Sequence, residues 1–120
     1  MRQMAFKKAY IEPILDGRKT QTLRARTSHV EGDIIRAMCH WGKPPFAYLE
    51  VTGVEPVALA EITDDMACAD GYDDAEDLKT ILVDLYPGVR TFFRIAFRPV
   101  APETARELDE RQRERSETTA

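Results

Sequence analysis

Apolar and polar positions change their period several times along the chain, beginning with a short helical pattern. The apolar residues of positions 9–16 recur at helical spacing, at Tyr10, Ile14 and Leu15. Pro13 fits a first helical turn and Gly17 fits the position after the last turn, so a short helix is expected. Residues 4–8 before it are short and mixed, which is typical of an edge strand.

Alternation typical of β-strands dominates the middle and the end of the chain. The expected strands are 20–26, 34–41, 46–62 and 91–97. Gly53 and Pro56 interrupt the longest of these runs, which predicts two strands or one strand with a sharp bend. Pro99 and Pro102 mark the exit from the last strand.

Two helices are expected between the third and the fourth of these runs. Thr63 is a good N-cap for the first, which ends near Asp70. Asp73 or Asp74 caps the second, and its apolar stripe consists of Leu78, Ile81, Leu82 and Leu85.

Strands interrupted by helices at two places predict a small, partly open β-barrel of the α+β class. We expect about five to six mostly antiparallel strands with two to three helices, within a domain spanning residues 1–100. Residues 101–120 are polar and charged and cannot bury an apolar stripe. They are therefore expected to be disordered or to form a frayed helix.

Composition excludes several classes of protein. No apolar run in the 120 residues approaches the roughly 20 needed to span a bilayer, and the first residues lack the apolar core of a signal peptide. A cytoplasmic protein without membrane contact is expected. Cys39 and Cys68 form neither a disulfide framework nor a CxxC site, and we expect both thiols to be buried. With only His29 and His40 besides, no metal or other cofactor is expected.

Charge is distributed unevenly along the chain. Residues 1–48 contain nine Lys and Arg against four Asp and Glu, whereas residues 49–120 contain eight against seventeen. The basic half can form a surface that attracts phosphate groups, even though the whole chain carries a net charge of −4. Alternatively, the two halves mix on the folded surface and their charges cancel.

The segment 16–26, DGRKTQTLRAR, combines four cations with two threonines around a glycine. A glycine turn that places lysine and threonine at the start of a strand directs donors and a hydroxyl nucleophile into a cleft. The rest of the chain offers little competing chemistry.

Four segments together resemble the ASCH domain family, a branch of the PUA-like β-barrels. In the order and spacing of the family they are GRKTQTLR (17–24), EGDIIRA (31–37), ALAEITDDMACADGY (58–72) and DLKTILVDLYPGVRTFFRIAF (77–97). The resemblance spans roughly residues 4 to 98 and is greatest to the small bacterial N4-acetylcytidine amidohydrolases. It implies a barrel whose cleft binds a modified nucleoside or RNA.

In these amidohydrolases the cleft carries a catalytic lysine, threonine and glutamate. The resemblance places the lysine at Lys19, which follows the glycine-arginine pair, and the threonine at Thr22. The glutamate of the family falls in the turn between the two helices. There this chain has Asp70, which is one methylene shorter and aligns only with a gap of one residue.

Amide hydrolysis needs a nucleophile, a base and donors for the developing oxyanion. We expect Thr22 to act as the nucleophile and Lys19 as the base, because burial and the nearby Arg18 and Arg24 would lower the pKa of its amine. Asp70 would act as the acid or orient the lysine. Residues three apart point to opposite faces of a strand, so Lys19 must precede the point where the alternation begins.

Three further residues are expected to hold the substrate. Arg24 shares a strand face with Thr22 and is suited to a phosphate or a carbonyl, and Arg18 adds a second cation. Tyr72 adjoins Asp70 and offers a surface on which a base can stack. Each also has an ordinary structural explanation, as part of a solvated face or of an apolar core.

The leading hypothesis is therefore an amidohydrolase that removes the acyl group from N4-acetylcytidine-type substrates. The alternatives are a non-catalytic RNA-binding module, which is favoured by the basic half, and a metal-independent ribonuclease, for which no catalytic histidine pair is apparent. Docking of a protein partner by the acidic half is a further alternative. A monomer is the default expectation for the oligomeric state.

Overall fold

The computed structural model describes residues 1–40 and 42–118, with side chains as far as residue 114. In chain order the elements are β1 (Arg2–Ala5), η1 (Lys8–Tyr10), α1 (Ile11–Leu15), β2 (Gln21–Arg24), β3 (Ile34–Met38), β4 (Ala47–Ala58), η2 (Leu59–Glu61), α2 (Asp64–Asp70), α3 (Ala75–Leu85), β5 (Thr91–Val100) and α4 (Pro102–Thr118).

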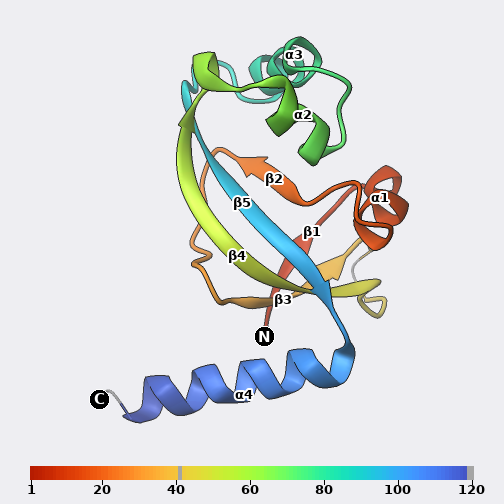
Figure 1. Cartoon of the computed structure of the whole chain (residues 1–120), viewed down its shortest axis with the longest axis vertical. Helices are drawn as coiled ribbons and strands as arrows, with labels where there is room; N and C mark the ends of the chain where they lie inside the picture. Colours follow the sequence, from red (N-terminus) through yellow and green to blue (C-terminus); the bar gives the residue numbers. More distant parts are fainter. Residues whose placement is uncertain (41, 119–120) are drawn as a thin grey trace.

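The five strands form one strongly curved sheet in the order β1-β3-β4-β5-β2. β1 pairs with β3 in parallel, and every other pair is antiparallel. No ladder joins β1 to β2 within the described residues, so the barrel is open between these two edge strands (Figure 1). The predicted small, partly open α+β barrel is confirmed.

Apolar side chains fill two separate clusters on opposite faces of the sheet. The first cluster lies inside the curved sheet and consists of Met4, Phe6, Ile14, Ile35, Ala37, Leu49, Val51, Ile95 and Phe97. The second lies beneath α2 and α3 and consists of Leu23, Val57, Ile62, Ala67, Leu78, Leu82 and Phe92. Alternation along β5 serves both clusters, because Phe92 points to one face while Ile95 and Phe97 point to the other.

A β-bulge keeps the long strand β4 in register with β5. Val51 lies opposite Phe97 and Val54 opposite Ile95, so β4 contributes one residue more than β5 over this interval. Without this extra residue Val54 would turn away from the first cluster, because a shift of one residue reverses the face of every following side chain. The run expected over 46–62 is therefore one strand with a bulge next to Gly53.

Several expected strand boundaries were wrong. The first strand is Arg2–Ala5 rather than 4–8, and the last continues through Pro99 to Val100 rather than ending at Phe97. A proline is tolerated at position 99 because β2 pairs only with the stretch from Phe93 to Ala96, which leaves that edge of β5 unpaired further on. β3 ends at Met38, and position 41 lies outside the described residues.

The predicted helix caps are confirmed. The Thr63 hydroxyl accepts a hydrogen bond from the Met66 amide at 3.2 Å, and the Asp74 carboxylate accepts one from the Asp77 amide at 2.9 Å. The short helix before Gly17 is confirmed as η1 and α1. The expected stripe of α3 divides into two parts, because Leu78 and Leu82 are buried while Ile81 is half-buried and Leu85 exposed.

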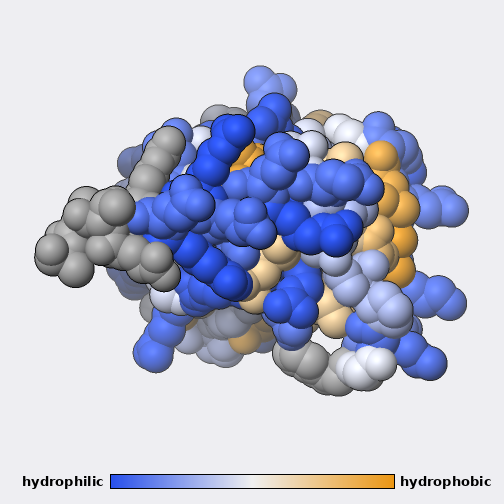
Figure 2. Space-filling view, turned by 90° about the horizontal axis from the view of Figure 1, so that it is seen from below, coloured by the Kyte–Doolittle hydropathy of each residue, from blue (hydrophilic) through white to orange (hydrophobic). Residues whose placement is uncertain are grey.

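The polar segment after residue 101 forms the helix α4, which crosses below the barrel at the end opposite α2 and α3 (Figure 1). Ala105 of this helix is fully buried, and the outer face of the helix is strongly hydrophilic (Figure 2). Among the described residues, no helix is both long and apolar enough to cross a membrane.

The cysteines differ from expectation in their burial. Both are free thiols, but Cys39 is half-buried and Cys68 is exposed. Cys68 lies on the outer face of α2, next to the buried Ala67. The general tendency of thiols to be buried therefore does not hold at these two positions.

Replacement of Gly71 tests the turn that ends α2. Gly71 has a φ of 101°, so Gly71→Ala is expected to lower the free energy of unfolding by about 1–2 kcal/mol in urea denaturation. Gly53→Ala is the matched control, because Gly53 has no positive φ and a Cβ there meets nothing within 4 Å. Equal losses in both variants would contradict the role given to the left-handed conformation.

Candidate active site

The backbone places Lys19 in a turn ahead of β2. Gly17, with a φ of 84°, reverses the chain after α1, and the Lys19 amide donates to the Pro13 carbonyl at 2.9 Å. The next amide, of Thr20, donates to the Ala69 carbonyl in α2 at 2.8 Å. Regular pairing starts only at Gln21, so the side chain of Lys19 is not bound by strand alternation. Lys19 therefore precedes the point where the alternation begins, as its spacing of three residues from Thr22 requires.

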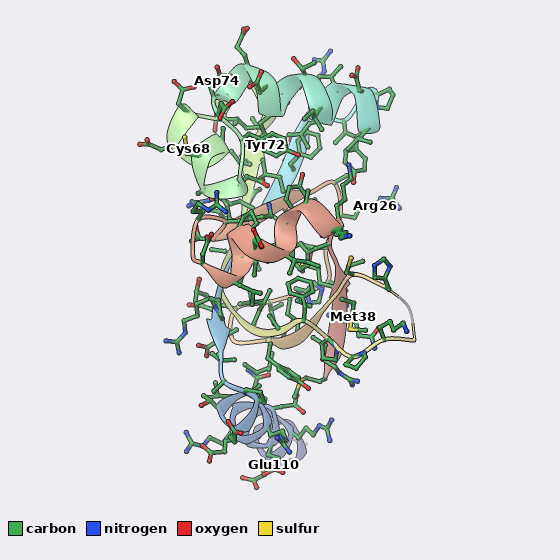
Figure 3. All side chains as sticks on the ribbon, turned by 90° about the vertical axis from the view of Figure 1, so that its right-hand side faces the viewer. Arg26, Met38, Cys68, Tyr72, Asp74 and Glu110 are labelled. Atoms are coloured by element: carbon green, nitrogen blue, oxygen red, sulfur yellow. The ribbon has the colours of Figure 1, made fainter. Side chains whose placement is uncertain are left out.

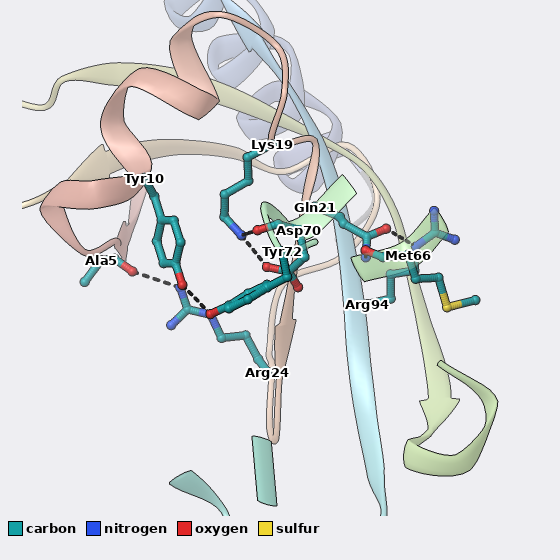
Figure 4. Close-up of polar contacts among 9 residues, drawn as sticks. All are labelled: Ala5, Tyr10, Lys19, Gln21, Arg24, Met66, Asp70, Tyr72 and Arg94. Atoms are coloured by element: carbon teal, nitrogen blue, oxygen red, sulfur yellow. Dashed lines mark hydrogen bonds and ion pairs between the residues drawn. The ribbon is translucent and has the colours of Figure 1, made fainter. Parts of the chain in front are cut away.

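The Lys19 side chain is almost fully buried, with 1% of its surface exposed. Its ammonium donates to the Asp70 backbone carbonyl at 2.6 Å and forms an ion pair with Oδ1 of the same residue (Figure 4). The Nζ atom also lies 4.5 Å from the centre of the Tyr10 ring, within the range of a cation–π contact. Lys19 is thus enclosed by the end of α2 on one side and by η1 on the other.

Burial shifts both members of this ion pair toward their neutral forms. It lowers the pKa of Lys19, and the charge of Arg24 adds to this effect, while Asp70 opposes it. Burial likewise raises the pKa of Asp70, against the influence of Lys19 and Arg24. A lysine whose amine loses its proton more readily than usual is suited to act as a base.

A pocket of about 130 Å³ opens beside this pair, where the barrel is unpaired between β1 and β2. Its polar lining consists of Lys7, Tyr10, Thr22, Arg24, Asp70, Tyr72 and Tyr86. The apolar wall comes mainly from α3 and includes Leu78, Ile81, Leu82 and Leu85. The exposed and half-buried residues of the α3 stripe therefore border the pocket.

Thr22 and Asp70 both line this pocket. Thr22 is 7% exposed, and its hydroxyl makes no side-chain hydrogen bond to Lys19 or Asp70 in the part of the chain that the structure describes. The Asp70 Oδ2 atom is buried and has no hydrogen-bond partner among the described residues. The structure thus brings Lys19 and Asp70 into direct contact and places Thr22 in the same pocket, without a bond between Thr22 and the pair.

Arg24 bridges the unpaired edges of the barrel. Its Nη2 atom donates to the Ala5 carbonyl of β1 at 2.8 Å, and its guanidinium lies 5.6 Å from the centre of the Phe6 ring. The remaining N–H groups make no hydrogen bond to any residue that the structure describes. Arg24 therefore holds its position through β1 and keeps donors available at the pocket.

Tyr72 is joined to Tyr10 by a hydrogen bond of 2.5 Å between the two hydroxyl groups. Burial, this bond and the charge of Asp70 all raise the pKa of Tyr72, so its hydroxyl stays protonated. The ring centres are 6.5 Å apart at an angle of 65°, an edge-to-face contact rather than parallel stacking. The two hydroxyls share one hydrogen bond and retain a second proton that can be donated.

Arg18 is the one predicted site residue that lies away from this group. Its side chain is exposed and its Nε atom donates to the Asp16 carboxylate at 2.8 Å. It does not line the pocket. Strand alternation places Arg24 on the same face as Thr22. Arg18 lies in the turn before β2, where no such alternation fixes the direction of its side chain.

Two polar contributions were missed by sequence reasoning. Gln21 is fully buried on the opposite side of β2, where it donates to the Met66 carbonyl at 2.9 Å and accepts from Arg94 (Figure 4). This bond fixes α2 over the strand and so helps to place Asp70. Tyr10 was expected only as an apolar position of the first helix, because no sequence pattern indicates that its ring contacts Lys19.

No cluster of three His, Cys, Asp or Glu side chains with the geometry of a metal site occurs among the residues that the structure describes. The polar groups that line the pocket are instead the amine of Lys7, one carboxylate, one guanidinium and four hydroxyls, and the buried amine of Lys19 is bonded to that carboxylate.

Two relatives are similar in sequence to this chain over most of its length. The N(4)-acetylcytidine amidohydrolase of Serratia proteamaculans is 34% identical over 98 residues, covering 80% of this chain and 95% of the relative. That of Cronobacter sakazakii is 32% identical over 99 residues, covering 81% and 94%. This chain belongs to the N(4)-acetylcytidine amidohydrolase family. No protein-family model matches it.

Solved structures agree with this family assignment at the level of the fold. The ASCH domain from Lactobacillus crispatus superimposes with a TM-score of 0.64 at 13% identity, covering 82% of this amidohydrolase-family chain and 79% of that domain. The ASCH protein of Zymomonas mobilis gives a TM-score of 0.62 at 12% identity, covering 84% and 73%. The fold is therefore that of an ASCH domain.

The environment of Lys19 predicts a dependence of its pKa on the electrons of the Tyr10 ring. Starting from Tyr10→Phe, adding one, two and then three fluorines to the ring withdraws electron density from its face without changing its shape. Because the face stabilises the ammonium form, the pKa of Lys19 should fall with each fluorine. NMR titration of isotope-labelled Lys19 measures this. A pKa that does not change along the series would contradict a cation–π contact.

Removal of Lys19 should leave a buried carboxyl that destabilises the fold as the pH rises. Loss of one partner of a buried ion pair costs about 3–5 kcal/mol. In Lys19→Met the pKa of Asp70 rises further above its unfolded value, because Lys19 no longer lowers it. A group with a raised folded pKa stabilises the fold below its unfolded pKa and loses that contribution as pH increases through the folded pKa.

Urea denaturation of Lys19→Met at acid and neutral pH tests this dependence. The loss of unfolding free energy relative to the parent chain should be smallest in acid and larger at neutral pH. The double variant Lys19→Met with Asp70→Asn removes the titrating group and should lose much less of its stability between the two conditions. An equal pH dependence in the single and double variants would exclude Asp70 as its source.

Proposed function

We propose that this chain hydrolyses the acyl amide of N4-acetylcytidine-type substrates, as the names of its relatives indicate for them. The observation that carries the proposal is the buried Lys19–Asp70 pair, whose Asp70 lines a pocket together with Thr22. Burying an ion pair is costly, and a pair with shifted pKa values beside a pocket is characteristic of catalytic sites.

In the proposed first step, the neutral amine of Lys19 takes the proton of the Thr22 hydroxyl. Oγ1 then adds to the acetyl carbonyl carbon, and the carbonyl oxygen becomes an oxyanion. Substrate binding must bring Oγ1 and Nζ within reach, since catalytic hydrogen bonds often tighten only in the complex. The unused N–H groups of Arg24 and the Tyr10–Tyr72 hydroxyl pair are donors available to this oxyanion.

The proposed intermediate collapses by breaking the bond between the acyl carbon and the exocyclic nitrogen. That nitrogen receives the proton held by Lys19 and leaves as the amine of the free base. Water then attacks the ester on Thr22, with Lys19 accepting its proton and returning it to Oγ1 as the acid is released. Asp70 orients the lysine through its backbone and side-chain oxygens throughout.

The alternative functions have less support from the described residues. A binding module without catalysis would not require a buried lysine-carboxylate pair. A ribonuclease that uses histidine would need that residue in the pocket, whose lining contains none. Contacts with the phosphates of a nucleotide are compatible with hydrolysis.

Loss of either proposed catalytic group should strongly lower turnover. Lys19→Met and Thr22→Val are each expected to lower kcat/KM for N4-acetylcytidine by about 10²–10⁴-fold, measured by the release of cytidine. Thr22→Ser keeps a hydroxyl and should retain part of the activity. Thr20→Val is the matched control, since Thr20 is exposed and its side chain lies outside the pocket. Full activity in Thr22→Val would exclude the threonine nucleophile.

The pH profile should report the protonation of the Lys19–Asp70 pair. Because the base must be unprotonated, kcat/KM should rise with pH along a limb that lies below the ordinary lysine pKa of 10.5. Asp70 raises the pKa of Lys19, so the limb of Asp70→Asn should move to lower pH. A limb at the ordinary lysine value, unmoved by this substitution, would show that Lys19 is not the base.

A further inference from the structure

A second cavity adjoins the pocket along the open edge of the barrel. Its volume is about 230 Å³, and its lining includes Gln3, Arg24, Arg26, Thr27, Ser28 and His29. Arg24 lines both cavities, and so does Ala5 of β1. The two spaces are therefore neighbours along the same unpaired edge.

The size of the first pocket limits what it can hold. At about 130 Å³ it is well below the roughly 300–1,000 Å³ of sites that enclose a drug-sized ligand. An acylated base is flat and compact, but a whole nucleoside is larger. Whatever is attached to the base must therefore extend past the rim, and the second cavity begins at that rim beside Arg24.

The second cavity is rich in positive charge that acidic residues do not neutralise. Arg26 makes no hydrogen bond or ion pair with any residue that the structure describes, and Arg24 bonds only to a backbone carbonyl. By contrast, Arg94 and Arg98 on β5 are paired with Glu55 and Glu50. In Figure 3 the side chain of Arg26 projects from the edge of the molecule, whereas Tyr72 lies inside it.

His29 adds a buried polar group to the far side of this cavity. Its side chain is 10% exposed, and its Nδ1 atom has no hydrogen-bond partner among the described residues, with the Asp33 carboxylate 3.5 Å away. Burial and the charge of Arg2 lower the pKa of His29, so the ring is neutral. The Arg2 guanidinium donates to the Ser28 carbonyl at 2.9 Å and lies 3.9 Å from the Asp33 carboxylate.

We propose that this second cavity binds the phosphate group of a nucleotide substrate whose acylated base occupies the first pocket. The proposal rests on the proposed function for the identity of that base. Successive residues of one strand face lie about 7 Å apart, so Arg24 follows Thr22 on the same face of β2. Arg26 lies two residues beyond the end of β2, in the bend that leads to the second cavity. Two guanidinium groups without acidic partners match the planar donor pattern that phosphate oxygens prefer. The substrate is then a nucleotide rather than a free nucleoside.

The test compares kcat/KM for N4-acetylcytidine and its 5′-monophosphate at low salt. The proposal expects the monophosphate to be preferred by about tenfold or more, and the preference to shrink as salt is added. In Arg26→Gln the ratio of the two values should approach one. Arg111→Gln is the matched control, because Arg111 is an exposed arginine on α4 and lies outside both cavities. Equal kcat/KM for the two substrates in the parent chain would overturn the proposal.

Calorimetric titration with cytidine and cytidine 5′-monophosphate separates this proposal from the proposed function. In one outcome no acylated substrate is hydrolysed, but the monophosphate binds more tightly than cytidine and Arg26→Gln removes the difference. This outcome would support the phosphate site and contradict the hydrolase function. If hydrolysis occurs and the two ligands bind equally, the phosphate site is wrong. An oligonucleotide with one N4-acetylcytidine distinguishes the sources, since preference for it over the monophosphate identifies an RNA strand.

Discussion

The candidate active site depends on one interaction, the buried ion pair between Lys19 and Asp70. It joins the turn after α1 to the last residue of α2, two segments separated by 51 residues in the chain. The amide of Thr20 and the carbonyl of Ala69 join the same two segments through their backbones. The pocket exists because these contacts hold α2 and α3 against the edge of the barrel where β1 and β2 do not pair. The same ion pair that is proposed for catalysis therefore also holds α2 in place.

The open edge of the barrel is the second constraint. Closing the sheet would have placed backbone hydrogen bonds where the pocket lies, since β1 and β2 would then face each other directly. Instead the side chain of Arg24 reaches the backbone of Ala5 and spans the gap at a single point. This leaves room for ligand on both sides of the arginine. The bulge in β4 contributes at a distance, because it lets one strand pack both apolar clusters and so supports both walls.

Features that depend on neighbours in the chain could be predicted from the sequence, and those that depend on distant partners could not. Thr63 and Asp74 act as caps through amides three residues away, and Gly17 acts within its own turn. Pro99 was misjudged because its tolerance depends on where β2 stops. The family resemblance placed Lys19, Thr22 and Asp70 in one cleft, and Arg24 and Tyr72 were expected there as chain neighbours of Thr22 and Asp70. Their geometry, including the Tyr10 ring over Lys19, required the fold.

The insertion of α2 and α3 between β4 and β5 has a consequence for how the protein opens. Residues 64–85 leave and rejoin the sheet at one end and pack on it through the second apolar cluster. Their polar bonds to β2 and the turn before it are few, among them those of Gln21 and Lys19. Such a segment can detach as a cooperative unit while the sheet remains intact, which amide hydrogen exchange detects as subglobal opening. A ligand that fills the pocket contacts both parts and binds only the closed form. Occupancy would then slow exchange throughout the two helices and make the whole chain unfold more nearly as one unit.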